Sequence, residues 1–285
     1  MALNHLFAEC KFWDKKTFKS LKMKLLHPLR LVFFVTVLVL GACNKEDNQP
    51  QQKTYELSYG QPVFYLRNQS ADYLVRPVNQ PVDGSFSSFP KGLELDPKTG
   101  EINVSQSESG MRYKITFTPT TGSAVSTHVV ISGINFPDKF YFLSNNDSIA
   151  FPVYNADRSN KLPSGNFDED NEANNSGCAM KTTDGQINLN ESIRRGLFGS
   201  TPKSDERKGF DIKYRLNDNS GNALNKIKVL LYYYNSMSEV PEDLKATMSE
   251  HLAMTLQPDN TPMANTLVSA AAPKPRPPCI VIIAH

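Results

Sequence analysis

The chain has 285 residues, a formal net charge of +2 and a charged fraction of 21%. Seven of its 31 Lys and Arg, but only two of its 29 Asp and Glu, lie in residues 1–42, so residues 43–285 carry 24 basic and 27 acidic side chains, a net charge of −3. This balance gives no sign of a nucleic-acid partner, and the remaining length suffices for two domains.

An apolar run of about ten residues, 31–40, follows the basic side chains of Lys24 and Arg30. It is too short to cross a hydrocarbon core, which needs roughly 20 helical residues. A run of this length behind basic residues is typical of a secretory signal. We expect residues 23–42 to be a signal peptide that is removed, and residues 1–22 to be an over-extended start upstream of it.

The stretch Leu40-Gly41-Ala42-Cys43 resembles a bacterial lipobox. The resemblance implies that the Cys43 thiol receives a diacylglycerol and that acyl chains such as palmitate anchor the protein in a membrane. Lys45-Glu46-Asp47 follows and resembles the export signal of Bacteroidetes surface lipoproteins. We expect a lipoprotein of the cell outer membrane, displayed on the cell surface by a flexible tether over 43–57, with periplasmic display as the alternative.

Short segments of alternating apolar and polar residues fill positions 58–136, where we expect strands at 62–66 and 73–78. A turn with clear chemistry lies at 96–100: Asp96 can accept hydrogen bonds from the turn, Pro97 presets φ, and Gly100 tolerates a positive φ. Beyond it, one strand should place its core side chains on a single face, namely Tyr113, Ile115 and Phe117.

Residues 90–102 read Pro-Lys-Gly-Leu-Glu-Leu-Asp-Pro-Lys-Thr-Gly-Glu-Ile. They resemble the Pro-x-Gly-Leu-x-Leu-Asp-x-x-Thr-Gly-x-Ile signature of Ig-like, cadherin-like repeats in bacterial surface proteins, although Asn103-Val104-Ser105 departs from the usual Ser-Gly. The resemblance implies an Ig-like antiparallel β-sandwich over 58–136, serving as a spacer or adhesion unit without a catalytic set. A sandwich alone does not assign a function.

Residues 137–285 predict a second β-rich domain of unrecognised type with one short helix. We expect a hairpin from 140–143 and 149–154, and a long polar loop over 155–177. The clearest hairpin joins 210–216 to 227–234, with one core face formed by Phe210, Ile212, Tyr214 and Leu216.

The helix is expected at 238–251, where Leu244, Met248 and Leu252 form one stripe. A final apolar strand at 279–284 should be inserted in a sheet, because a free apolar edge favours aggregation.

One serine is a candidate for modification, and one set of acidic residues is a candidate for metal binding. Asp147-Ser148-Ile149 resembles a Bacteroidetes O-glycosylation signal, which makes Ser148 a candidate, against the alternative of an ordinary loop serine. Asp168, Asp170 and Glu172 offer oxygen ligands for Ca²⁺. An EF-type loop would need Gly and Glu where Ala173 and Ala179 stand, so a solvated loop is favoured, and we expect no metal and no cofactor.

Two cysteines remain once Cys10 and Cys43 are assigned to the leader and the anchor. Outside the cytoplasm Cys178 and Cys279 can form a disulfide, and two unpaired thiols are the equal alternative. Tyr232-Tyr233-Tyr234 suggests a sugar platform, but consecutive strand residues point to opposite faces, which favours packing.

The histidines after the leader, His128, His251 and His285, are scattered, and we interpret them as structural. We therefore expect a non-enzymatic, lipid-anchored envelope protein with a binding, adhesion or spacer role towards a glycan or protein ligand. The alternatives are a structural subunit of an envelope assembly that donates its C-terminal strand to a partner and a hydrolase with a carboxylate site that the sequence does not reveal.

Overall fold

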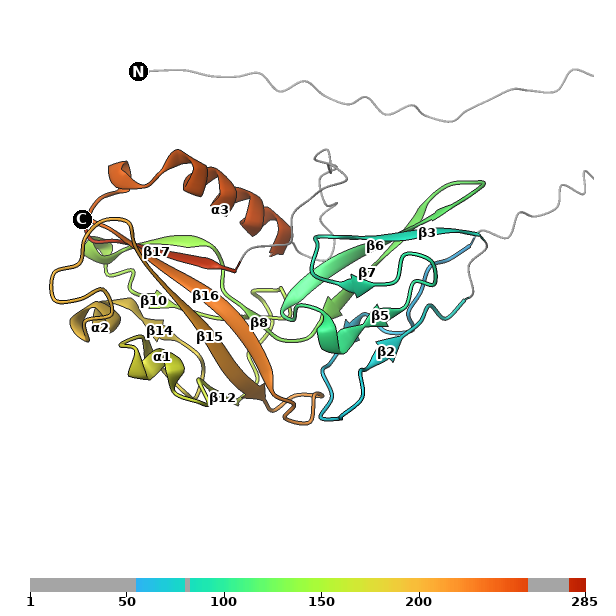
Figure 1. Ribbon diagram of the computed structural model, residues 1–285, viewed down its shortest axis with the longest axis horizontal. Coiled ribbons are helices and arrows are strands. Elements are labelled where there is room, and N and C mark those ends of the chain that lie inside the picture. Colours follow the sequence, from blue (N-terminus) through green and yellow to red (C-terminus); the bar gives the residue numbers. More distant parts are fainter. Residues whose placement is uncertain (1–54, 80–82, 256–276) are drawn as a thin grey trace, which may run out of the picture. The chain divides into compact units, whose positions relative to one another are not determined.

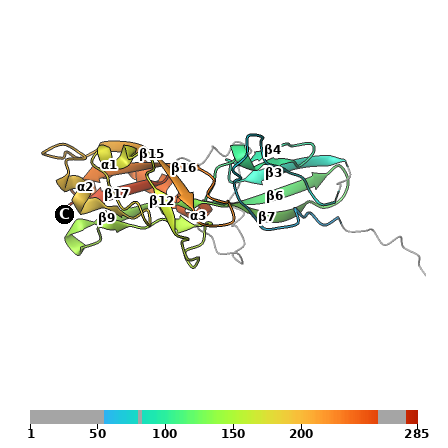
Figure 2. The same cartoon turned by 90° about the horizontal axis from the view of Figure 1, so that it is seen from below.

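Two β-sheets form the N-terminal half of the described chain (Figure 1; Figure 2). The computed structural model describes residues 55–79, 83–255 and 277–285, so Cys43, the leader and most of the tether lie outside the described residues. The larger sheet has the order β1-β7-β6-β3, with β1 Val63–Phe64, β7 Val125–Ile131, β6 Met111–Pro119 and β3 Gly84–Phe89. The smaller has the order β2-β5-β4, with β2 Leu74–Val75, β5 Ile102–Asn103 and β4 Glu94–Leu95.

The core of this half lies between the two sheets and confirms the β-sandwich. Tyr113, Ile115 and Phe117 of β6 are at most 1% exposed, and Ile102 of β5 is fully buried against them. Because side chains alternate along a strand, these three residues lie on one face of β6, the face that points into the core. One pairing departs from an antiparallel sandwich, since β1 runs parallel to β7.

The turn at 96–100 forms as expected. Asp96 Oδ1 accepts hydrogen bonds from the backbone N–H groups of Lys98 at 2.8 Å and Thr99 at 2.7 Å. Gly100 has φ +71°, and a Cβ there would lie 2.7 Å from the ring of Phe86. The turn therefore lets the β4–β5 connection pack directly against the larger sheet.

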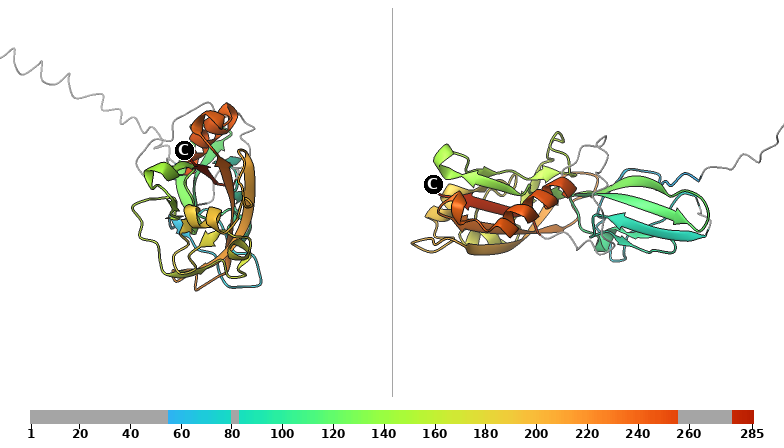
Figure 3. Two further views of the ribbon diagram at one scale, coloured as in Figure 1. Left: turned by 90° about the vertical axis from the view of Figure 1, so that its left-hand side faces the viewer. Right: turned by 90° about the horizontal axis from the view of Figure 1, so that it is seen from above.

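A five-stranded mixed sheet organises the C-terminal half (Figure 1; Figure 3). Its order is β12-β15-β16-β17-β9, with β12 Gly165–Phe167, β15 Glu206–Leu216, β16 Asn225–Tyr234, β17 Cys279–Ile283 and β9 Lys139–Phe142. Two small sheets lie beside it, one of β10 Ile149–Ala150, β14 Ile187–Asn188 and β13 Ala179–Met180, the other of β11 Val153–Tyr154 and β8 Ile134–Asn135.

The final strand is inserted in its own sheet, as predicted. β17 lies between β16 and β9 and runs parallel to both. Ile280 and Ile282 face one core cluster, while Cys279, Val281 and Ile283 face another. Burial on both faces explains why the strand is apolar at every position.

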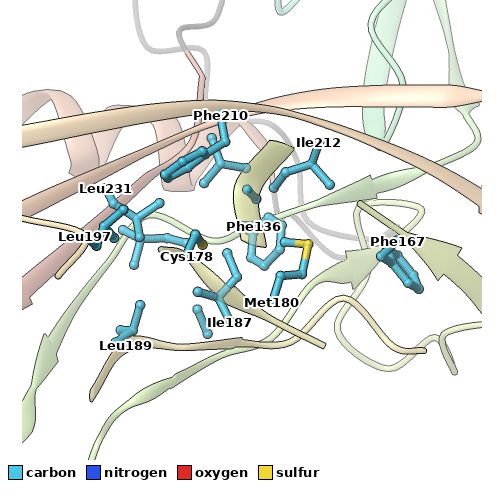
Figure 4. Packing of buried hydrophobic residues seen from close by; sticks show 14 of the residues in the cluster. Phe136, Phe167, Cys178, Met180, Ile187, Leu189, Leu197, Phe210, Ile212 and Leu231 are labelled. Atoms are coloured by element: carbon cyan, nitrogen blue, oxygen red, sulfur yellow. The ribbon is translucent and has the colours of Figure 1, made fainter. Parts of the chain in front are cut away.

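One core cluster fills the space between the large sheet and the small sheets (Figure 4). The predicted face of β15 is part of it: Phe210, Ile212, Tyr214 and Leu216 are at most 4% exposed. Ile134 and Phe136, which lie within the range 58–136 expected for the sandwich, also belong to this cluster. The segment that links the two halves is therefore part of the hydrophobic core of the C-terminal half.

α3 (Glu242–Thr255) covers the other face of β16 and β17 (Figure 3). Met248, 3% exposed, packs with Tyr234 and Val281. The helix type is confirmed, but α3 begins four residues later than expected, after the 3₁₀-helix η3 at Met237–Glu239. β16 and β17 are parallel neighbours, and parallel strands need a long crossover connection. α3 lies in this connection.

Two predictions for this half are wrong. The hairpin from 140–143 and 149–154 does not exist, because β9 pairs with β17 and β10 pairs with β14. The polar stretch 155–177 is not simply a loop, since it contains β12 and the short helix α1 (Glu172–Asn175). A further helix, α2, spans Leu189–Arg194. Short 3₁₀-helices η1 and η2 occupy Val104–Gln106 and Leu143–Asn145.

Candidate functional site

Hydrogen bonds at the junction of the two halves position the candidate site. The backbone N–H of Ile134 donates to the Tyr214 hydroxyl at 3.0 Å, and Ser109 Oγ donates to Asn225 Oδ1 at 2.8 Å. Asn155 Oδ1 accepts the N–H of Gly133 at 3.1 Å. All three bonds lie within the single compact unit Thr54–His285. The bond from Ser109 holds the segment before β6 against the β15–β16 hairpin, the bond from Ile134 holds the start of β8 against β15, and the bond to Asn155 ties the residue before β8 to the residue after β11.

Close backbone approach at this junction depends on Gly110. Its φ is +72°, and a Cβ added there would lie 2.2 Å from the carbonyl oxygen of Ile134. Its own N–H donates to the carbonyl of Ile131 at 2.8 Å. A side chain at this position would push β8 away from β6.

A cleft of about 560 Å³ opens beside these contacts. One wall is the segment 105–109 of the N-terminal half, and the other is the outer face of β15 and β16. The charged side chains that line it are Glu108, Asp211, Lys213, Lys226 and Lys228. The volume lies within the range of roughly 300–1,000 Å³ that small-ligand sites occupy.

The register of the β15–β16 hairpin explains this lining. Asp211 lies opposite Lys228 and Lys213 lies opposite Lys226, on the face that turns away from the core face of β15. Lys226 and Lys228 are exposed. Alternation along the two strands therefore places three lysines and one aspartate side by side on the cleft wall.

Lys213 is already engaged with a carboxylate of its own chain. Its Nζ lies 2.6 Å from Asp170 Oδ2, and this hydrogen bond raises the pKa of the lysine while lowering that of Asp170. The bond holds both groups charged at neutral pH. Lys226 and Lys228 are thus the cleft lysines best placed to meet an anionic group of a ligand.

The calcium candidates take structural roles instead of converging. Asp168 is 1% exposed, and its carboxylate accepts hydrogen bonds from the N–H groups of Ala173 and Asn174, each at 2.9 Å. The carboxylate therefore satisfies the first N–H groups of α1, where Glu172 also stands in the first turn. Within the described part of the chain, His, Cys, Asp and Glu form no group able to hold a metal ion.

Ser148 lies in the turn before β10, where it is half-buried. Its carbonyl oxygen accepts the N–H of Leu189 at 2.8 Å, which fixes the turn against the start of α2. Its glycosylation stays a prediction.

The two cysteine sulfurs are not linked in this structure. Cys178 lies in the core cluster between the sheets, and Cys279 lies in the cluster under α3. Burial raises the pKa of the Cys178 thiol to about 12. Cys178 is therefore a core side chain, and the pairing of the two cysteines stays a prediction.

The three consecutive tyrosines are packed in the core. Tyr232 and Tyr234 face the cluster under α3, whereas Tyr233 faces the opposite cluster, and all three are at most 9% exposed. The guanidinium of Arg207 lies 5.0 Å from the centre of the Tyr232 ring. The alternation argument against a tyrosine platform thus holds.

The histidines lie apart from one another. His128 is an exposed residue of β7 opposite Lys114, and the N–H of His285 donates to the carbonyl of Asn235 at 2.9 Å. His251 belongs to α3. The structure does not bring them to one site.

The cleft residues Asp211, Lys226 and Lys228 were missed by sequence reasoning. Their signal is present in the sequence, because they alternate with the core residues of the clearest hairpin. What the sequence lacked was the second wall, which comes from 105–109, more than a hundred positions away.

Comparisons with known proteins give no family assignment. No family model matches the chain, and no curated protein matches it. Among solved structures, it is similar to the protocadherin gammaB7 EC3-6 cis-dimer at 11% identity, with a TM-score of 0.20. That match covers 64% of this chain and 48% of the other, so the chain spans about half the length of the protocadherin chain.

Proposed function

We propose that this protein is a lipid-anchored component of the cell envelope with a non-catalytic binding role, and that the cleft takes a ligand bearing carboxylate or sulfate groups. The observation that carries the binding role is the cleft of about 560 Å³ whose wall presents Lys226 and Lys228. Two ammonium groups two residues apart on one strand face can contact successive acidic groups of an extended ligand.

The anchor rests on the order of basic, apolar and small residues that ends at Cys43. Two or three acyl chains bury enough methylene groups for stable attachment, at ~0.8 kcal/mol for each. Within the described residues, no helix combines the length and apolar character that crossing a bilayer requires. Display on the cell surface is the favoured orientation, because Lys45-Glu46-Asp47 resembles an export signal.

A second candidate function, an assembly subunit that donates its last strand, loses the feature that suggested it. All five residues of β17 are buried, and they pair with β16 and β9 of the same chain. The strand is therefore occupied within the chain.

Metabolic labelling tests the anchor. Cells that express the full chain are fed alkyne-palmitate, and we expect label on the wild type and none on Cys43→Ala. Protease added to intact cells should remove the labelled protein. An unlabelled wild-type protein would contradict the anchor, and a labelled protein resistant to protease would contradict surface display.

Affinity electrophoresis tests the cleft. We expect gels containing acidic polysaccharides to retard the full chain, and the double variant Lys226→Glu, Lys228→Glu to migrate freely. The double variant Lys203→Glu, Lys208→Glu is the matched control, because it makes the same change in net charge at two exposed lysines that do not line the cleft. Retardation that the double variant retains, or no retardation in any acidic gel, would overturn the cleft as the binding site.

A further inference from the structure

A groove in the C-terminal half is independent of the charged cleft. Three segments meet there: 151–152 between β10 and β11, 161–164 before β12, and 183–186 before β14. Its volume is about 750 Å³. All three segments are attached to elements of the same core cluster, so the groove is built on one side of a single packed unit.

Phe151 stands out in this groove because it is 55% exposed. Its neighbours along the chain behave differently: Ala150 is fully buried and Val153 is 8% exposed. Leaving a phenyl ring in water gives up the stabilisation of roughly 1.5–3 kcal/mol that burial of such a side chain contributes. The groove therefore presents an accessible aromatic ring to a ligand.

Strand register brings a hydrogen-bonding side chain to the same place. Ala150 pairs with Ile187, and the residues next to this pair, Phe151 and Gln186, both line the groove. Gln186 accepts the N–H of Lys181 through its carbonyl at 2.8 Å. Its side-chain amide donates to Asp184 Oδ2 at 3.3 Å. Hydrogen bonds within the turn 181–186 thus fix the side of the groove that carries Asp184 and Gln186.

The remaining lining combines apolar rings with hydroxyl groups. Pro152 and Pro163 are half-buried, and Thr183 and Ser164 are exposed. A sugar ring has the matching character, because one face presents C–H bonds to an aromatic ring while its edge carries hydroxyl groups.

The charges in the groove favour a neutral ligand. Asp184 forms an ion pair with Lys181 of its own turn. Lys161 is the one basic residue of the lining, beside that paired carboxylate. The groove lining thus holds one lysine and one carboxylate, whereas the cleft lining holds three lysines and two carboxylates, with Lys213 paired to Asp170.

We propose that the groove at Phe151 is a subsite for a neutral saccharide, with the Phe151 ring against one face of a sugar and Gln186 and Asp184 at its hydroxyl edge. The inference rests on the proposed binding role and adds to it a second surface of different chemistry. The charged cleft recognises acidic groups, and the groove recognises a sugar ring.

Saturation-transfer NMR with the full chain tests this subsite. The probes are neutral tetrasaccharides of glucose, mannose and galactose. We expect at least one to receive magnetisation, and Phe151→Ala to raise its Kd about tenfold, the equivalent of roughly 1.4 kcal/mol. Phe151→Tyr keeps the ring and should keep the affinity. Val78→Ala, which truncates a side chain that is 64% exposed on the N-terminal half, should leave it unchanged.

Three results would overturn the inference: no tetrasaccharide binds the wild type, Phe151→Ala binds as tightly as the wild type, or a tetraproline peptide binds at Phe151 while the saccharides do not. If acidic-polysaccharide gels retard both the wild type and Phe151→Ala while no neutral saccharide binds, the saccharide subsite in the groove is rejected. Binding of acidic ligands in the cleft is then still supported. If a neutral saccharide binds and no acidic gel retards the protein, the subsite in the groove is supported and binding of acidic ligands in the cleft is rejected.

Discussion

The hydroxyl oxygen of Tyr214 accepts the backbone N–H of Ile134 at 3.0 Å, in a position where the tyrosine is fully buried. Tyr214 comes from β15 in the large sheet, and Ile134 begins β8, directly after the last long strand of the sandwich. The ring also stacks on Phe167 at a centroid distance of 5.9 Å. This one side chain thus connects the core of the second half to the segment that leaves the first.

Tyr214→Phe should lower the free energy of unfolding by about 1–3 kcal/mol, because it leaves a buried N–H without its acceptor while keeping the ring. Urea denaturation of the full chain measures the change. Tyr233→Phe is the control for removing a hydroxyl group from a tyrosine of the same core cluster. Burial and nearby carboxylates raise the pKa of Tyr233, so its hydroxyl is also uncharged at neutral pH. Equal losses for both variants would contradict this role of Tyr214.

Gly110→Ala should destabilise the protein more than Gly221→Ala. Both glycines have a positive φ, +72° and +62°, so each substitution carries the left-handed penalty of roughly 1–2 kcal/mol. Only Gly110 adds a clash, with the carbonyl oxygen of Ile134 at 2.2 Å, whereas a Cβ at Gly221 meets nothing within 4 Å. Thermal unfolding compares the two variants, and a Gly110→Ala protein as stable as Gly221→Ala would refute the tight junction.

The stability that Asp96 contributes to the sandwich should be lost in acid. Hydrogen bonds from the N–H groups of Thr99 and Lys98 hold the pKa of this carboxyl below its usual range. A lowered folded-state pKa contributes stability above the unfolded pKa, and the contribution is lost as pH falls through the folded pKa. The wild type should therefore exceed Asp96→Asn in urea midpoint at neutral pH. The difference in urea midpoint between the two proteins should become smaller below roughly pH 4. A difference that does not change with pH would be inconsistent with a charged acceptor in the turn.

Cys178 should resist alkylation in the folded protein. Burial raises the pKa of its thiol to about 12, and the thiolate is the reactive form. Iodoacetamide at pH 8 followed by peptide mapping should label Cys178 only after unfolding in urea. Rapid labelling of the native chain would contradict the packing, and a Cys178–Cys279 linked peptide would show a disulfide that the structure lacks.

Asp168→Ala should cost about 1.5–3 kcal/mol in unfolding free energy, because a buried carboxylate that accepts several N–H groups is lost from the start of α1. Asp170→Ala should change it by about 1 kcal/mol at most, since both side chains of its pair with Lys213 are partly exposed to solvent. Calcium should leave the melting temperature of the wild type unchanged. A rise with calcium that Asp168→Ala abolishes would restore Asp168 as a ligand.

Local features of the fold could be predicted from the sequence. The turn at 96–100 and the hairpin of β15 and β16 each depend on residues close together in the chain, so turn chemistry and alternation suffice. The buried strand β17 was predictable from its unbroken apolar run.

Non-local pairing could not be predicted. β9 and β10 are separated by six residues, yet they join different sheets because β17, from the far end of the chain, takes the place beside β9. α1 and α2 contain four and six residues, too few to show a helical period. The cleft and the Phe151 groove are both assembled from distant segments, so neither is visible in one stretch of sequence.

The central claim is that this protein binds a ligand without converting it. The most direct test incubates the full chain with acidic and neutral polysaccharides and follows two readouts on the same samples, retention of the protein and the chain length of the polysaccharide. We expect retention with the chain length unchanged. Shortened polysaccharide chains would reveal a hydrolase, and the absence of retention by every polysaccharide would contradict the binding role.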